Sequence, residues 1–345
     1  MAEKTRDDKL WDTKAGSFPQ QSSFEKQLKF LLRYASLAPS SHNTQPWRFS
    51  IIGQGINVFA DYKRRLKVAD PTDKELFISV GCAIANIQIG ADHFGFKSKI
   101  VFFPKGVGKP LVATISLIRP VKAKIKKKSL LNYMTKRLTN RSMYNSRKTI
   151  PSGVISNMKI LIGELAIELL VVTKRNTIRR LASITKKGIY TALSDKRFRV
   201  ELSGWVRHNW TNQGDGMPAD TMGMPAAASI VAPALVRSAM IAESTSQMEE
   251  KMIMSASAVG ILHAKKDSKL DWVKAGIAFE RIALLGIKHG VYVAPLSAAI
   301  EVEEQKKELK STLTNLEVPM VFFRMGYPTK KYPHSPRLAL EQTVN

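Results

Sequence analysis

The apolar positions in the first third of the chain recur with helical and strand spacing. Between residues 24 and 35 they recur every three or four residues, which predicts a helix with one buried face. Ser22 and Glu25 have the spacing of a capping box at its start, and Pro39 ends it. The same reasoning predicts strands over 47–52, 56–62, 99–103 and 111–118 and a long helix over 72–93.

A second series of elements follows the lysine-rich stretch VKAKIKKK at residues 121–128. Residues 212–225, NQGDGMPADTMGMP, have loop composition, and this segment is long enough to form a flap. Around it, the pattern predicts three strands, over 167–173, 258–264 and 318–325. It also predicts four helices: one that begins at about Pro151, one over 177–193, one that ends at about Ala239 and one over 271–289.

The two long helices resemble each other in sequence. Gly81 and Gly276 are 195 residues apart, and so are Gly95 and Gly290, which end the two helices. Alanine and isoleucine recur in the same register between the glycines, and a strand is predicted after each helix. This repetition suggests a duplicated α+β unit whose halves pack about a pseudo-two-fold axis.

The pattern therefore divides the chain into four parts. We expect an N-terminal tail at 1–21, a first half at 22–120, a basic linker at 121–128 and a second half at 129–345, which includes a flap at 206–228.

Composition and charge narrow the class of protein. The chain is 44% hydrophobic and 24% charged, which is typical of a globular protein. The net charge of +26 suggests acidic partners, but the cations are scattered and no nucleic-acid module is recognisable. We therefore expect a basic solvated surface and no nucleic acid. The single cysteine, Cys82, lies in an apolar run and is expected to be buried and inert. With no secretory signal or membrane span apparent, we expect a cytoplasmic protein.

The stretch APSSHNTQPWRF, residues 38–49, concentrates polar side chains after the first helix. Ser40, Ser41, Asn43 and Gln45 offer hydroxyl and amide groups within six residues. They could form an elaborate helix-terminating turn, or a loop whose polar edge meets a ligand.

The stretch KRLTNRSMY, residues 136–144, alternates Arg137, Thr139 and Arg141. In an extended segment these side chains point to one side, where two guanidinium groups and a hydroxyl suit a phosphate. The alternative is a solvated basic loop.

Two later segments complete the candidate chemistry. Pro295, Leu296 and Ser297 follow a presumed strand, where exposed backbone could meet a ring system or simply turn. Arg337 follows a proline-rich segment that should run across a surface.

Together these residues resemble the nitroreductase family of flavin enzymes. APSSHNTQPWRF is similar to the signature APSSxNxQPWxF, and Arg137-x-Thr139-x-Arg141 is similar to RxSxR, with Thr in place of Ser. The segment Pro295–Ser297 resembles the one beside the flavin, and Arg337 resembles the arginine that grips the FMN phosphate. The resemblance implies an α+β nitroreductase-like fold with antiparallel or mixed sheets flanked by helices, and FMN as the cofactor.

One departure from the family pattern is informative. No RxSxR precedes residue 24, and no APSSxN follows the helix near Pro151, so each half holds what the other lacks. This division resembles the fused twin or Acg-type members, in which one flavin site would lie between the two halves of a pseudo-dimer that could act as a monomer. The polar loop of the first half would then contact a flavin that the second half holds.

The resemblance leaves two functions open. One is an NAD(P)H-consuming, FMN-dependent reductase of nitroaromatic or quinone-like acceptors, in which the hydride chemistry belongs to the flavin and no side chain need act as a base. The other is a flavin-binding or flavin-sequestering protein whose lid prevents turnover.

Overall fold

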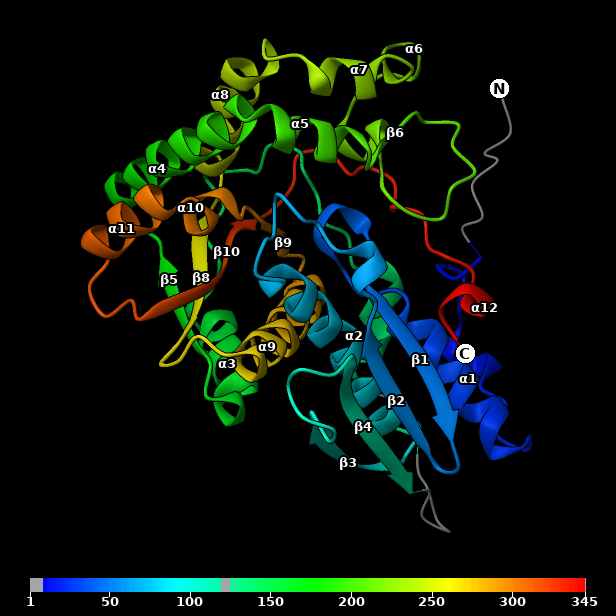
Figure 1. Ribbon diagram of the computed structural model, residues 1–345. Coiled ribbons are helices and arrows are strands. Elements are labelled where there is room, and N and C mark those ends of the chain that lie inside the picture. Colours follow the sequence, from blue (N-terminus) through cyan, green and yellow to red (C-terminus); the bar gives the residue numbers. More distant parts are fainter. Residues whose placement is uncertain (1–8, 119–124, 127, 345) are drawn as a thin grey trace.

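The computed structural model describes residues 9–118, 125–126 and 128–344 and contains two four-stranded antiparallel sheets (Figure 1). In the first sheet the strand order is β1-β2-β4-β3. Its elements are α1 (Phe24–Ala35), β1 (Trp47–Ile52), β2 (Gly55–Ala60), α2 (Lys74–His93), β3 (Lys97–Phe102) and β4 (Leu111–Ile118).

The second sheet has the strand order β5-β8-β10-β9. Its elements are α3 (Ser152–Ile162), β5 (Glu168–Val172), β8 (Ala258–Ala264), α9 (Lys269–Lys288), β9 (Tyr292–Pro295) and β10 (Val318–Gly326).

The two sheets repeat one topology. In each, a helix precedes the first strand, the long helix follows the second, and the last strand inserts between the second and the third. Buried and half-buried residues alternate along most of β1 and β2, which is the pattern of strands with one face in the core. The repeat agrees with the predicted duplication and confirms the predicted α+β fold class.

The long helices α2 and α9 pack against each other between the two sheets (Figure 1). They approach so closely because glycines face each other at the crossing. A Cβ on Gly81 would lie 2.1 Å from the carbonyl oxygen of Val273, and one on Gly276 would lie 1.9 Å from that of Ile78. The largest buried cluster accordingly contains residues of both halves, among them Phe77 and Ile282.

The halves differ mainly in what connects their first two strands. Between β1 and β2 the chain turns over Gly53 and Gln54, whereas between β5 and β8 it makes a long helical insertion. The insertion contains α4 (Arg175–Ser194), α5 (Lys196–Ser203), β6 (Val206–Arg207), β7 (Met217–Pro218), α6 (Ala226–Ser229), α7 (Ala232–Arg237) and α8 (Ile241–Met254).

The C-terminal chain links the two halves. After β9 come α10 (Ala298–Glu301) and α11 (Glu303–Thr312), which pack near α4. Beyond β10 the chain crosses back to the first half, where α12 (Leu340–Thr343) lies beside α1 (Figure 1) and Val344 bridges Phe49 of β1. Short 3-10 helices complete the described fold: η1 (Ala15–Ser17), η2 (Ser41–Asn43), η3 (Tyr62–Arg64), η4 (Leu130–Lys136), η5 (Gly163–Leu165) and η6 (Ala219–Met222).

Several predicted details are corrected by the structure. Ser23, not Ser22, caps α1, because its hydroxyl accepts from the Lys26 amide. Residues 9–21 are packed rather than a free tail: Leu10 is buried, and the Phe18 ring stacks on Phe94 with centroids 4.0 Å apart. The helix expected to end at Ala239 is broken into short pieces. Helices α5, α8, α10 and α11 were not predicted.

Other expectations on buried residues are confirmed. Cys82 is buried, and burial raises the pKa of its thiol well above the ordinary value, which makes it a poor nucleophile. Most of the predicted linker, residues 121–124 and 127, lies outside the described residues. Among the described residues, no helix has the length and apolar character needed to cross a membrane.

The glycine crossing predicts a large effect of a single methyl group. Gly81→Ala should lower the free energy of unfolding by about 1–3 kcal/mol or more, because its Cβ meets a backbone oxygen that can move only if the helices separate. Urea unfolding followed by circular dichroism measures the change. Gly163→Ala is the matched control, since a Cβ there has nothing within 4 Å. Equal stability of both variants would contradict the close crossing.

Candidate functional site

A small cavity lies where the end of α1, the segment after η4 and the C-terminal chain meet. Six of the residues predicted to bind a cofactor line it, although they come from three separate parts of the sequence. They are Ser40, Asn43, Arg137, Thr139, Arg141 and Arg337. The cavity volume is about 40 Å³, enough for a few water-sized groups.

Two of the arginines are anchored on the carbonyl groups that follow α1. Arg137 Nη2 donates to the Leu37 oxygen at 2.9 Å, and Arg337 Nη2 donates to the same oxygen at 3.1 Å and to that of Ala38 at 3.2 Å. Carbonyl groups at a helix C-terminus carry partial negative charge, so they attract cations. The shared Leu37 oxygen brings the two guanidinium groups close together.

Further contacts fix the orientation of each anchored arginine. Arg137 Nε lies 3.3 Å from Oε1 of Glu280, a fully buried carboxylate on α9. Arg337 Nη1 donates to Asn43 Oδ1 at 2.8 Å, and its guanidinium lies 4.6 Å from the centre of the Trp11 ring. Both arginines are almost fully buried.

The third arginine is differently placed. Arg141 Nη2 lies 3.8 Å from Met217 Sδ, and in the described part of the chain no carboxylate forms an ion pair with it, although Glu249 acts on it electrostatically. Burial lowers the pKa of Arg141. Burial and the nearby Arg141 charge lower the pKa of His42 to about 4, so this histidine is neutral at physiological pH. Arg141 is therefore the cation in the cavity that is best able to accept an anionic ligand.

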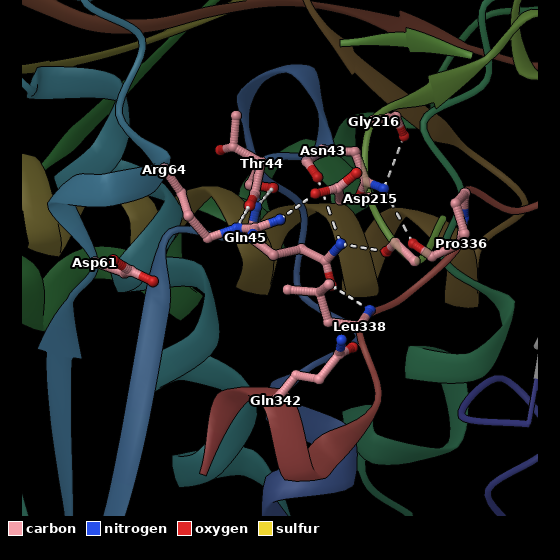
Figure 2. A network of polar contacts seen from close by, with 12 residues as sticks. Asn43, Thr44, Gln45, Asp61, Arg64, Asp215, Gly216, Pro336, Leu338 and Gln342 are labelled. Carbon is pink, nitrogen blue, oxygen red and sulfur yellow. Dashed lines mark hydrogen bonds and ion pairs between the residues drawn. The ribbon is translucent and has the colours of Figure 1, made fainter. Parts of the chain in front are cut away.

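The side chains of Asn43 and Gln45 hold other parts of the protein (Figure 2). Asn43 Nδ2 donates to the carbonyl oxygens of Gly216 at 2.9 Å and Pro336 at 3.0 Å. Gln45 Nε2 donates to the Gly214 oxygen at 2.8 Å, and its Oε1 accepts from the Leu338 amide at 3.0 Å. The polar loop thus binds the flap and the C-terminal chain together.

Ion pairs strengthen the attachment of the flap (Figure 2). Asp215, which lies two residues before β7 in the flap, pairs with Arg64 of η3 and with Arg207 Nη2, the latter at 3.0 Å. Arg64 Nε also donates to the Thr44 oxygen at 2.6 Å. The flap of the second half is therefore bound to the polar loop of the first.

The backbone of the polar loop is held in an unfavourable conformation. His42, Asn43 and Gln45 have φ angles of 50°, 56° and 50°, in the left-handed region that non-glycine residues seldom occupy. Such conformations cost about 1–3 kcal/mol each and persist where surrounding contacts impose them, often at functional sites. The contacts of Asn43 and Gln45 supply that constraint here.

The remaining predicted site residues lie outside the cavity. Ser41 donates its hydroxyl to Glu75 at the start of α2. Pro295 ends β9 and pairs with Phe323 of β10. The Leu296 amide donates to the Phe322 oxygen at 2.8 Å, which extends the contact between these two strands by one residue. Ser297 is the residue that precedes α10.

A carboxyl group connects two of these outlying residues. The neighbouring carboxylates of Glu75 and Asp70 raise the pKa of Glu301, and the Ser297 side chain forms a hydrogen bond with it. Because Ser41 bonds to Glu75, the polar loop and the Pro295–Ser297 segment approach the same group of acids from opposite halves.

The structure also reveals site residues that sequence reasoning missed. Trp11 lay in the presumed tail, and Asp215 and Arg64 carried no motif. Glu280 had one available signal, since it is a lone acid inside the apolar run GIAFERIALLG. Fully buried carboxylates are rare unless they are paired, so its partner could have been sought among the arginines.

Comparison with known proteins supports a nitroreductase-like assignment. No family model matches the chain. Two curated proteins from Mycobacterium tuberculosis strains CDC 1551 and H37Rv, each named "Putative NAD(P)H nitroreductase", are 22% identical to it over 325 residues. The match covers 92% of this chain and 90% of each relative. The similarity therefore extends over both halves.

Solved structures give a weaker match. The FMN- and NADPH-dependent nitroreductase NfnB from "sphigopyxis sp. strain HMH" has a TM-score of 0.43 at 13% identity, covering 63% of this chain and 98% of that one. A nitroreductase with bound FMN from Bacteroides fragilis has a TM-score of 0.38 at 11% identity, covering 62% and 95%. These scores are too low to transfer any residue or ligand to this chain.

The ion pairs of the flap predict a local effect of their removal. Asp215→Asn should make amide hydrogen exchange in residues 205–218 about tenfold faster, because two charge-assisted contacts are lost. Hydrogen exchange followed by mass spectrometry measures this. Glu25→Gln, which removes an exposed ion pair with Lys29 on α1, should leave the exchange of the flap unchanged. Unaltered exchange in Asp215→Asn would show that these pairs do not hold the flap.

Proposed function

We propose that the protein is an FMN-dependent, NAD(P)H-consuming oxidoreductase of the nitroreductase type. The observation that carries the proposal is the convergence of Arg137, Arg141 and Arg337 on one cavity from segments far apart in the sequence. The full-length similarity to the two mycobacterial proteins supports the reaction class.

The residues around the cavity fit the phosphate group of FMN. Two guanidinium groups are held close together, the third has no ion-pair partner among the described residues, and the side chains of Thr139 and Ser40 add hydroxyl groups. A cavity of about 40 Å³ suits a group of phosphate size but lies far below the roughly 300 Å³ of a pocket for a whole cofactor. The ribityl chain and ring would therefore lie outside this cavity.

Each part of the chain would have a separate task. When bound, FMN supplies the hydride-transfer chemistry. Arg137, Arg141 and Arg337 would neutralise its phosphate. Ser41 and the Pro295–Ser297 segment, which approach each other across the two halves, would flank the ring. The flap would limit the access of water and of the acceptor.

We also assign the chain to the fused, twin or Acg-type members, with one site between its two halves and no second subunit needed to complete that site. The duplicated sheet topology and the unequal distribution of motifs support this assignment. Nitroaromatic or quinone-like compounds would be the acceptors.

A second candidate function is flavin sequestration. The contacts that attach Gly214, Asp215 and Gly216 to the polar loop favour it, since a flap held this firmly could cover the ring and prevent turnover. The two candidates share the phosphate site and differ in whether reductant reaches the flavin.

Purification and anaerobic reduction separate these functions. The protein should be yellow, and heat should release FMN rather than FAD. Mixing with NADPH should bleach the flavin absorbance within seconds if the protein is a reductase, whereas a sequestering protein should keep its absorbance. Colourless protein that does not take up added FMN would refute both.

Arg141→Ala tests the phosphate site. The dissociation constant for FMN should rise about tenfold to a hundredfold, because one charge-assisted contact contributes about 1.5–3 kcal/mol. Fluorescence titration of FMN into the apoprotein measures it. Arg147→Ala, at an exposed neighbouring arginine, is the control and should bind FMN normally. Equal affinities in the two variants would place the phosphate elsewhere.

A further inference from the structure

Glu280 is a buried acid that the proposed function does not use. It lies on α9 in the core between the two halves and has no exposed surface. Its Oε1 lies 3.3 Å from Arg137 Nε, and this guanidinium lines the cavity. Burying a carboxylate is costly unless a partner compensates, so the pair with Arg137 explains how Glu280 is tolerated.

The duplication shows that helix packing does not require an acid at this position. The offset of 195 residues that relates Gly81 to Gly276 makes Ala85 of α2 the residue equivalent to Glu280 of α9 in the repeat. Ala85 is also fully buried, so the equivalent position in the first half is filled by a methyl group. The acid occurs in the half that carries Arg137 and Arg141. Its role is therefore tied to the arginines.

The groups around Glu280 define its charge. Burial raises its pKa to about 7, while Arg137, Asn86 and Arg337 act in the opposite direction, in that order. On α2, Cys82 faces it with a thiol that burial keeps protonated, and Asn86 donates to the Tyr34 oxygen of α1 at 3.0 Å. Next to it on α9, Arg281 turns away to pair with Glu164 at 2.7 Å. The cations that favour its charged form are thus two of the three arginines at the cavity.

We propose that Glu280 is a positioning residue, which holds Arg137 ready in the ligand-free site and takes up a proton when a phosphate dianion binds there. This inference rests on the proposed function, in that the dianion is the phosphate of FMN. The carboxylate gains one proton from solvent, and no other bond changes.

The charges at the cavity determine how binding of a dianion changes the protonation of Glu280. A dianion that binds Arg137 and Arg337 offsets the two positive charges that stabilise the Glu280 carboxylate. The pKa of Glu280 then rises above its ligand-free value of about 7. At a pH between these two pKa values, the protein with the dianion bound carries more protons than the free protein. The affinity for the dianion therefore falls as the pH rises. The FMN phosphate does not produce this effect, because its own pKa near 6 leaves it a dianion above pH 7.

Calorimetry measures the coupling directly. FMN is titrated into the apoprotein at pH 7.5 in buffers with different ionisation enthalpies, which reveals the number of protons taken up. We expect about half a proton or more per FMN, and a dissociation constant about fivefold higher at pH 8 than at pH 7. Heats that do not depend on the buffer would overturn the proposal while leaving FMN binding, and hence the proposed function, intact.

Glu280→Gln identifies the group that takes up the proton. This variant keeps the shape of the side chain, and its FMN binding should lose the dependence on buffer. Glu164→Gln, an exposed acid paired with the same helix, is the control and should keep it. Equal proton uptake in Glu280→Gln and the control would overturn the assignment. Thermal unfolding of each variant confirms that it is folded.

Sulfate separates failure of this inference from failure of the proposed function. It remains a dianion throughout the range, so its affinity at pH 6.5 and 8.5, measured by protein fluorescence, reports the anion site without FMN. About tenfold tighter binding at pH 6.5 in the wild type but not in Glu280→Gln would support the coupling even if FMN does not bind. If neither FMN nor sulfate binds with proton uptake, the proposal is wrong.

Discussion

The close crossing of α2 and α9 at Gly81 and Gly276 is the constraint on which the rest of the structure depends. Because no side chain separates the helices there, the two sheets are held at a fixed distance on either side of the crossing. The crossing brings Glu280 of α9 near Asn86 of α2 and the end of α1. Glu280 in turn pairs with Arg137, which lines the cavity, so the packing of the core influences the position of this arginine.

The two halves share a topology but contribute different segments to the cavity. The first contributes a polar loop after α1 and turns tightly between β1 and β2. The second opens the equivalent connection into the insertion that contains the flap, and it sends its C-terminal chain back over the first half. Each half therefore completes the site with a segment that its counterpart does not have.

The sequence was sufficient for the features that depend on local pattern. The periodicity of α1, α2 and α9 and the alternation in β1 gave these elements within a few residues. The resemblance to a known family brought together six of the residues that line the cavity. It could not show that Asn43 and Gln45 bind the flap, because those partners are backbone oxygens that any residue supplies. Nor could it place Trp11, whose role depends on a contact with Arg337 near the opposite end of the chain.

The charge balance at the cavity explains why it should favour a dianion. Three guanidinium groups brought together in a buried site would repel one another strongly if nothing offset them. The Glu280 carboxylate and the carbonyl oxygens of Leu37 and Ala38 offset part of that charge, which lets the cluster form without a ligand. With Glu280 ionised the side chains carry a net charge of two, and the proposed uptake of a proton on binding would leave three guanidinium charges facing the two negative charges of a phosphate dianion. The overall charge of +26 is not needed to attract a dianion to the cavity. The four charged groups there, Glu280 and the three arginines, are buried or half-buried and act at contact distance, where screening by salt is weak.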